Sequence, residues 1–163
     1  MLFYYEQRAF QDFIDLLEKT FPLSLIDHDL LSKLSYSYLQ LGEMELALKY
    51  SAMSLALDLD NELALYVKLK ISLFYSLFTS ENKNDTIRLA RRYISVKKFK
   101  GHDSLNLLAY AYATNGDFER SIYFQKKAIF AAELDGYNSI KQHKYLKYFE
   151  KGEIYKDEFC DLK

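Results

Sequence analysis

Turn-forming residues are scarce in this sequence. Among 163 residues there are five Gly and one Pro, the two residues that most often interrupt regular structure. Sheets need frequent turns, whereas long helices joined by short loops do not. Half of the residues are hydrophobic and 28% are charged, a balance that allows one compact domain or one short repeat array. The scarcity of turns therefore predicts helix throughout.

Cysteine is almost absent as well, because Cys160 is the only one. A single thiol excludes an internal disulfide and a zinc site with several thiolate ligands. Residues 1–10 show neither the basic leader nor the apolar run of a signal peptide. No stretch reaches the roughly 18 uninterrupted apolar residues that a membrane helix needs. We therefore expect a cytoplasmic protein with no membrane partner.

The net charge of −1 hides an asymmetry between the two halves of the chain. Residues 1–62 hold 4 Lys and Arg against 11 Asp and Glu, a net of −7. Residues 63–163 hold 18 against 12, a net of +6. One half is acidic and the other is basic.

Two segments of the sequence repeat one another, residues 31–57 and residues 105–131. Each has apolar residues every three or four positions, the spacing of two amphipathic helices, with a Gly between them. Gly42 and Gly116 suit the left-handed residue that ends a helix and turns the chain back. The matched pairs are Leu31 and Leu105, Leu34 and Leu108, Tyr38 and Tyr112, Met44 and Phe118, Ala47 and Ser121, and Ser54 and Ala128.

The same phase continues into the rest of the chain. Phe13, Ala47, Thr86 and Ser121 mark equivalent positions, with spacings of 34, 39 and 35 residues. A period near 34 is typical of the tetratricopeptide repeat, and the sequence resembles that family over nearly its whole length. Its last residues look like the ending of many bacterial members, in which a final helix covers the array.

The resemblance implies an all-α fold, a right-handed α-solenoid of tetratricopeptide-like helix pairs with a C-terminal covering helix. We expect a single repeat domain over residues 1–163, with units at about 1–27, 28–61, 62–101 and 102–136 and a covering helix and tail at 137–163. The predicted helices are residues 8–20, 30–41, 44–57, 62–78, 85–98, 104–115, 118–133 and 139–150. Asp29 and Asp103 open matched helices and are predicted to cap them.

No enzyme motif is found in the sequence. It contains no HExxH, no Gly-rich phosphate loop and no Ser/His/Asp grouping at a strand–turn–helix. His28 and His102 lie about two repeats apart, each directly before an Asp, and are interpreted as helix-start residues rather than as a metal or acid–base pair. His143 is predicted to be solvated, and Cys160 has no obvious base beside it. We expect no catalysis, no cofactor and no metal site.

A basic run between residues 88 and 100 could meet the phosphates of a nucleic acid. It consists of Arg88, Arg91, Arg92, Lys97, Lys98 and Lys100, with Tyr93 and Phe99 interleaved. The sequence pI of about 6.3 and the charged outer helix faces that are normal in repeat proteins favour a solvated face instead. No nucleic-acid partner is expected.

Tyrosine is abundant, with 15 residues, and two of them are candidates for binding. Tyr36 and Tyr110 precede Tyr38 and Tyr112 by two residues and so point about 160° away from them around a helix. Tyr38 and Tyr112 are predicted to support the fold. The resemblance implies that the first helix of each unit lines a concave groove, here with Asp29, Ser32, Tyr36, Leu39, Gln40, Tyr66, Lys70, Asp103, Asn106, Tyr110, Ala113 and Thr114. The alternative is aromatic packing between units.

The function that the resemblance implies is a non-catalytic adaptor or scaffold that binds a peptide or protein segment in this groove. Proteins that clamp the acidic tails of heat-shock chaperones carry Lys and Asn where this chain has Ser32, Tyr36 and Tyr110, so that activity is not implied. A small chaperone for secreted proteins and a structural self-associating module are the alternatives. Apolar residues of the first unit, Phe3, Tyr4, Phe10 and Phe13, predict a homodimer through that unit.

Overall fold

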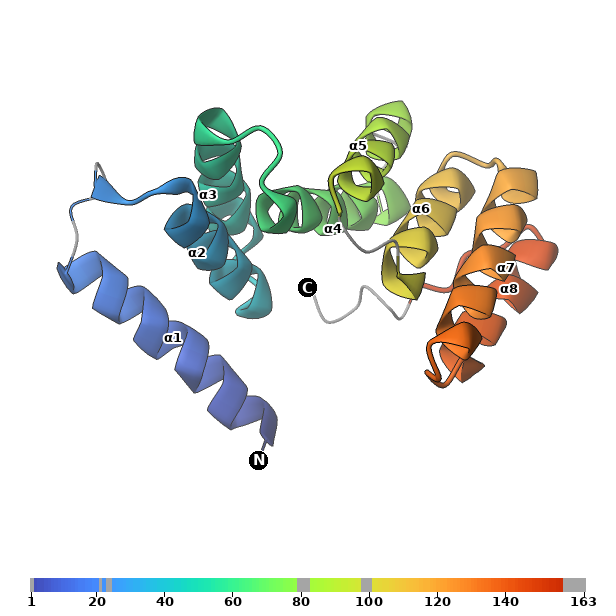
Figure 1. Cartoon of the computed structure of the whole chain (residues 1–163), viewed down its shortest axis with the longest axis horizontal. Coiled ribbons are helices and arrows are strands. Elements are labelled where there is room, and N and C mark those ends of the chain that lie inside the picture. Colours follow the sequence, from blue (N-terminus) through green and yellow to red (C-terminus); the bar gives the residue numbers. More distant parts are fainter. Residues whose placement is uncertain (1, 21, 23–24, 79–82, 98–100, 157–163) are drawn as a thin grey trace. The chain divides into compact units, whose positions relative to one another are not determined.

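The computed structural model describes residues 2–20, 22, 25–78, 83–97 and 101–156, without the side chains of residues 2–8 and 83. Within these ranges the regular elements are helices, so the predicted all-α fold is confirmed. They are α1 (Leu2–Thr20), α2 (His28–Gln40), α3 (Met44–Leu57), α4 (Glu62–Phe78), α5 (Lys83–Val96), α6 (His102–Thr114), α7 (Phe118–Leu134) and α8 (Ile140–Glu150) (Figure 1).

The predicted glycine turns join α2 to α3 and α6 to α7. Gly42 and Gly116 both have φ +80°, a conformation that costs a glycine little. Beside them, the N–H of Glu43 donates to the carbonyl of Tyr38 at 2.9 Å, and the N–H of Asp117 donates to that of Tyr112 at 3.0 Å. These bonds satisfy carbonyls that the helix end leaves unpaired. Each turn thus sets two helices side by side, as Figure 1 shows for both pairs.

The described residues fall into two compact units, residues 2–71 and residues 72–156, and the division lies inside α4. In the first unit, α2 packs against α1 and α3. The core of this unit includes Ile14 and Leu17 of α1, Leu31 and Leu34 of α2, and Ala47 of α3, all at most 4% exposed.

In the second unit, α6 packs against α5 and α7, and α7 packs against α8. The core includes Ala90 of α5, Leu108 and Ala111 of α6, Ala128 of α7 and Phe149 of α8, all at most 4% exposed. The contact between α7 and α8 agrees with the prediction that a last helix covers the helix pair before it.

Helix ends differ from the prediction in two informative places. The cap of α2 is Asp27, whose carboxylate accepts a hydrogen bond from the N–H of Leu30 at 2.8 Å, so the prediction that Asp29 caps this helix is wrong. Gly101 occupies the capping position of α6 and has no side chain to offer, so Asp103 does not cap α6 either. Asp29 and Asp103 lie in the first turns of α2 and α6, where a negative charge interacts favourably with the helix dipole.

The first helix is longer than predicted, because α1 begins at Leu2 rather than at residue 8. In the part of the chain that the structure describes, no helix is both long and apolar enough to cross a membrane.

Candidate protein-binding faces

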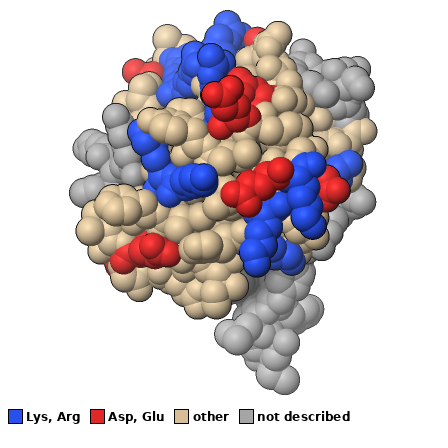
Figure 2. All heavy atoms as spheres, turned by 90° about the vertical axis from the view of Figure 1, so that its right-hand side faces the viewer, with Lys and Arg blue, Asp and Glu red and all other residues tan. Residues whose placement is uncertain are grey.

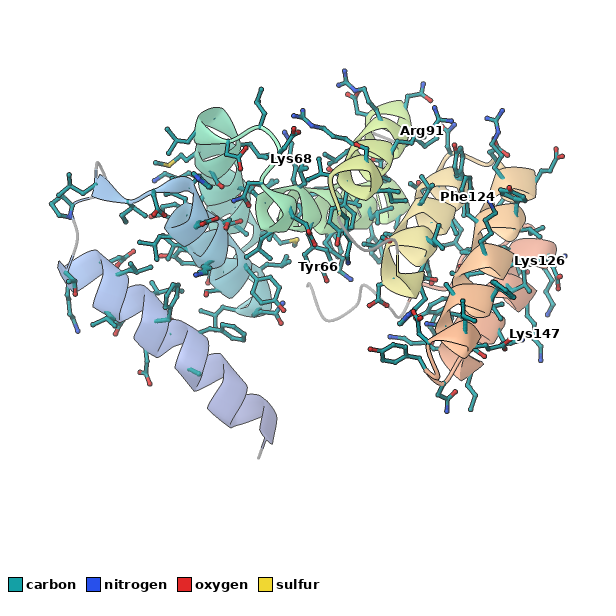
Figure 3. All side chains as sticks on the ribbon, in the orientation of Figure 1. Tyr66, Lys68, Arg91, Phe124, Lys126 and Lys147 are labelled. Atoms are coloured by element: carbon teal, nitrogen blue, oxygen red, sulfur yellow. The ribbon has the colours of Figure 1, made fainter. Side chains whose placement is uncertain are left out.

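The first candidate face lies on α2 and is centred on Tyr36, which is half-buried. Its ring meets the ring of Phe10 edge-on, with centroids 6.0 Å apart, and lies 6.3 Å from the ring of Tyr66. Tyr66 comes from α4 and is labelled in Figure 3. The structure therefore brings together the two tyrosines that the sequence assigned to one face in this unit.

Four further predicted residues of this unit lie on the same two helices as Tyr36 and Tyr66. Asp29 and Gln40 are exposed, and Lys70 is half-buried one turn after Tyr66 on α4. Leu39, in contrast, is only 2% exposed and belongs to the core. We call the accessible set, Asp29, Tyr36, Gln40, Tyr66 and Lys70, the Tyr36 face.

Ser32, the remaining predicted residue of α2, is also buried. Its hydroxyl donates to the carbonyl of Asp29 at 2.8 Å and is thereby occupied within the helix.

The second candidate face lies on α6, where Tyr110 occupies the place that Tyr36 has on α2. Here the structure departs from the expected open groove, because Tyr110 is completely buried. The rings of Tyr145 and Phe149, both from α8, meet it edge-on with centroids 5.2 Å away. Its hydroxyl donates to the backbone carbonyl of Tyr155 at 3.0 Å. The chain itself covers this tyrosine.

The other predicted residues of α6 are mostly buried too. Asp103 is exposed, but Asn106 and Thr114 are 8% and 4% exposed. Thr114 donates to the carbonyl of Ala111 at 3.0 Å. Asn106 Oδ1 has no hydrogen-bond partner among the described residues. We call the set around Tyr110, namely Asn106, Tyr110, Tyr145, Phe149 and Tyr155, the Tyr110 cluster.

Tyr38 and Tyr112 lie in the core, as predicted, and each stacks on an aromatic residue of the next helix. Tyr38 is parallel to Tyr50 at 5.3 Å, and Tyr112 is parallel to Phe124 at 5.4 Å, each with 3° between ring planes. Arg91 and Phe124, both labelled in Figure 3, contact Tyr112 from α5 and α7. These two tyrosines are therefore part of the scaffold.

The hydroxyl groups of Tyr38 and Tyr112 have hydrogen-bond partners of opposite charge. Tyr38 donates to Glu18 Oε1 at 3.0 Å, whereas Tyr112 accepts from Arg91 Nη2 at 2.6 Å. Burial raises the pKa of Tyr38, and the hydrogen bond to Glu18 and the charge of Glu18 raise it further. Burial likewise raises the pKa of Tyr50, with Glu18 as the next cause. The neutral phenol is the favoured form at both positions.

The histidines occupy the places that the sequence predicted. His28 and His102 are the first residues of α2 and α6, and His143 is exposed on α8. His28 Nδ1 lies 3.3 Å from Asp29 Oδ1 and from the side-chain nitrogen of Asn61. Among the described residues, no group of three His, Cys, Asp or Glu side chains could hold a metal ion.

Basic side chains of the second unit are interspersed with acidic ones. Figure 2, which faces the side of the molecule that carries α7 and α8, shows Lys and Arg distributed among Asp and Glu rather than gathered in one patch. In α5, Arg88 pairs with Asp85 at 3.0 Å. Lys98, Phe99 and Lys100 of the predicted basic run lie outside the described residues.

Two of the four apolar residues expected to form a surface on the first unit have described side chains. Phe10 and Phe13 are half-buried rather than fully exposed. The side chains of Phe3 and Tyr4 and the whole of Cys160 lie outside the described residues. The homodimer stays a prediction.

Sequence reasoning missed the role of the chain's end in the Tyr110 cluster. The spacing of Tyr145 and Phe149 was a usable signal, because residues four apart share one face of a helix. No comparable signal indicated that the carbonyl of Tyr155 would reach Tyr110, 45 positions earlier.

Comparison with known proteins identifies one repeat directly. A family model of the tetratricopeptide repeat matches residues 102–130, which correspond to α6 and most of α7. Neither the search of curated proteins nor the search of solved structures found a match to the chain. The chain therefore contains a tetratricopeptide repeat, and repeats of this kind generally mediate protein–protein interactions.

Proposed function

We propose that this tetratricopeptide-repeat-containing chain is a non-catalytic protein–protein interaction module that holds a segment of another protein on the Tyr36 face. The observation that carries the proposal is the tetratricopeptide match to residues 102–130. The same glycine turn and the same parallel ring pair recur at α2 and α3. That architecture supports an adaptor or scaffold role.

The Tyr36 face is proposed as the binding surface because its side chains remain accessible. Two half-buried tyrosine rings lie 6.3 Å apart, and the side chains of Asp29 and Gln40 on α2 are exposed. Tyrosine suits recognition because its large ring loses little conformational entropy and keeps a polar tip. Burying two such rings supplies apolar area, and the polar groups around them give orientation.

The charge of the first unit favours a basic partner segment. Residues 1–71 hold 6 Lys and Arg against 11 Asp and Glu, a net of −5. Complementary charge raises association rates and disfavours acidic competitors more than it adds affinity. Association should therefore slow as the salt concentration rises, because exposed charges more than about 10 Å apart are screened at 0.1 M.

An affinity capture from the source cell, read by mass spectrometry, tests the proposal. The wild-type chain, Tyr36→Ala, Tyr66→Ala and the control Tyr123→Ala are compared; Tyr123 is 54% exposed on α7. The two variants in the Tyr36 face should lose the same captured protein, each by about tenfold or more in affinity if these rings act as anchors. The control should retain it.

Unchanged capture by Tyr36→Ala and Tyr66→Ala would exclude this face as the binding surface. Loss of capture with Tyr123→Ala alone would move the surface to the outer side of α7. Circular dichroism of each variant shows whether a lost interaction reflects a lost fold.

A further inference from the structure

The chain turns back on itself directly after α8. Gly152 has φ +71°, and the N–H of Glu153 donates to the carbonyl of Tyr148 at 2.9 Å. This bond closes the helix end in the same way as the turns after α2 and α6. Residues 153–156 then continue without regular secondary structure. We call them the tail segment.

The side chain of Tyr155 anchors the tail segment to α8. Its ring lies 5.8 Å from that of Tyr145 and 5.3 Å from that of Tyr148. Lys144 Nζ lies 3.9 Å from the centre of the ring and donates to the Tyr155 hydroxyl at 2.7 Å. One aromatic side chain thus receives two ring contacts, a cation contact and a hydrogen bond.

The backbone and the next side chain of the tail segment reach two other helices of the same unit. The carbonyl of Tyr155 accepts from the hydroxyl of Tyr110 on α6. The ammonium of Lys156 lies 5.6 Å from the centre of the Phe78 ring on α4. The segment therefore contacts the unit through an aromatic side chain, one backbone carbonyl and one cation.

These contacts are those of a bound peptide rather than of a packed helix. The tail segment has no regular structure and contributes a side chain and a carbonyl to a face formed by three helices. The equivalent tyrosine of the other repeat, Tyr36, meets the ring of Phe10 on α1 and remains half-buried. The repeat itself therefore does not require this cover, and the segment is an addition to it.

We propose that the Tyr110 cluster is a receptor for extended protein segments that carry an aromatic residue followed by Lys or Arg, and that the tail segment occupies it as an internal ligand. This rests on the proposed function, since it assigns a second segment-binding face to the same module. The aromatic residue takes the place of Tyr155, and the basic residue takes the place of Lys156 over Phe78. A bound segment that also donates an N–H to Asn106 Oδ1 gains a hydrogen bond that the described tail residues do not make.

The internal ligand sets the affinity that an outside segment needs. A short tether holds its ligand at an effective concentration on the order of millimolar. The tethered tail segment has a fixed ratio of effective concentration to dissociation constant. A competing segment occupies the cluster only when its own ratio of concentration to dissociation constant exceeds that value. Removing the tail should therefore raise the apparent affinity for outside segments by about tenfold or more.

Fluorescence anisotropy with a labelled peptide tests the proposal. The probe is a synthetic peptide with the sequence of residues 152–163 and Ser in place of Cys160. It is titrated with the full chain and with a variant that ends after Glu153, which keeps the turn that closes α8. The variant should bind at least tenfold more tightly than the full chain, and a peptide with Tyr155→Ala should bind neither.

Tyr110→Phe and its matched control Tyr123→Phe, which lies in neither the Tyr36 face nor the Tyr110 cluster, sharpen the test in the shortened variant. Loss of the Tyr110 hydroxyl removes one hydrogen bond to the peptide and should weaken binding about threefold to tenfold. Loss of the Tyr123 hydroxyl should leave it unchanged.

A measurement in the full chain covers the case in which the shortened variant does not fold. Cys160 is the only cysteine, so a fluorophore attaches only at this position, which follows the tail segment in the sequence. The anisotropy of this label should fall when Tyr155→Ala releases the tail. It should also fall when unlabelled peptide is added in excess. Unchanged anisotropy in both cases would overturn the proposal.

Two other results would contradict it: a folded shortened variant that does not bind the peptide, and equal binding by the full chain and the variant. Neither would affect the proposed function, which depends on the Tyr36 face and is tested by Tyr36→Ala and Tyr66→Ala. Capture of a cellular partner that is lost in those variants, together with no peptide binding at Tyr110, would remove the inference alone.

Discussion

The helix pairs α2–α3 and α6–α7 use one scaffold in two different ways. Both have a glycine turn with φ +80° and a parallel pair of rings about 5.3–5.4 Å apart. On the opposite side of the first helix they diverge. Tyr36 stays half-buried between Phe10 and Tyr66, whereas Tyr110 is completely covered by α8 and the tail segment.

The difference shows which positions of a repeat are fixed by packing and which are free to change. Positions between the paired helices hold small buried residues in both pairs, such as Ala47 and Ser121, because two helices in close contact tolerate little change in volume. Ser35 of α2, for example, donates to the carbonyl of Ala47 on α3 at 2.8 Å. On the opposite side of the first helix, the exposure of a residue such as Tyr36 or Tyr110 depends on which segment covers it.

The largest expected effect is a loss of stability, and it should differ between the phenylalanines that cover Tyr110 and Tyr36. Phe149, which covers Tyr110, is completely buried, whereas Phe10, which covers Tyr36, is half-buried. Phe149→Ala should lower the free energy of unfolding by roughly 3–5 kcal/mol, and Phe10→Ala by about half as much. Urea unfolding followed by far-ultraviolet circular dichroism measures both. Equal losses would mean that the two faces are covered alike.

Close helix contact within each pair is tested next. Ala47 and Ala128 have no exposed area, so Ala47→Leu and Ala128→Leu should each destabilise by about 1–3 kcal/mol through overpacking. Ala52 is exposed on α3, and Ala52→Leu is the matched control, with a change within about 0.5 kcal/mol. If the two core variants melted like the control, the assigned repeat positions would be wrong.

The surroundings of Tyr38 predict a pH dependence. Because burial and Glu18 raise its pKa above the ordinary value near 10, the folded state favours the neutral phenol. That contribution is fully present below pH 10 and is lost as the pH rises from 10 toward the folded-state pKa. Tyr38→Phe should therefore flatten the fall in stability above pH 10, as measured by urea unfolding at each pH.

Glu18→Gln should give an intermediate profile in the same experiment. It removes the charge that raises the pKa of Tyr38 but leaves the burial, which is the larger cause. A Tyr38→Phe profile identical to the wild type above pH 10 would contradict the assignment of this tyrosine to the core.

The smallest expected effect concerns the two helix starts. Asp27 and Gly101 have nearly the same backbone angles, φ −77° and ψ 173° against φ −70° and ψ 170°, but only Asp27 caps its helix. Asp27→Gly should destabilise α2 by about a few tenths of a kcal/mol, and Gly101→Asp should stabilise α6 by a similar amount. Among the described residues, a Cβ at Gly101 meets nothing within 4 Å. Thermal melts of both variants should shift in opposite directions.

Most of the fold could be predicted because the helices follow from apolar residues spaced three or four positions apart. The limits of α3 and α4 agree with the prediction, since apolar spacing and the flanking polar residues mark both ends. Helix starts were less predictable where two acids compete, as Asp27 and Asp29 do. Only the backbone geometry decides which carboxylate reaches an unpaired N–H.

The candidate faces were predictable only in part, because burial depends on distant segments. The periodicity assigned Tyr36 and Tyr110 to equivalent positions, and it separated them from the core residues Tyr38 and Tyr112. It could not predict that Tyr155 would reach back to Tyr110, because a single carbonyl contact leaves no pattern in the sequence.

Site-specific photo-crosslinking in the source cell shows whether the Tyr36 face binds another protein. A photoreactive residue replaces Gln40 or Lys70 on that face, or Ala52 on the exposed side of α3 as the control. We expect one shared adduct from positions 40 and 70 and none from position 52. An adduct from position 52 alone, or none from positions 40 and 70 while the chain remains folded, would contradict that expectation.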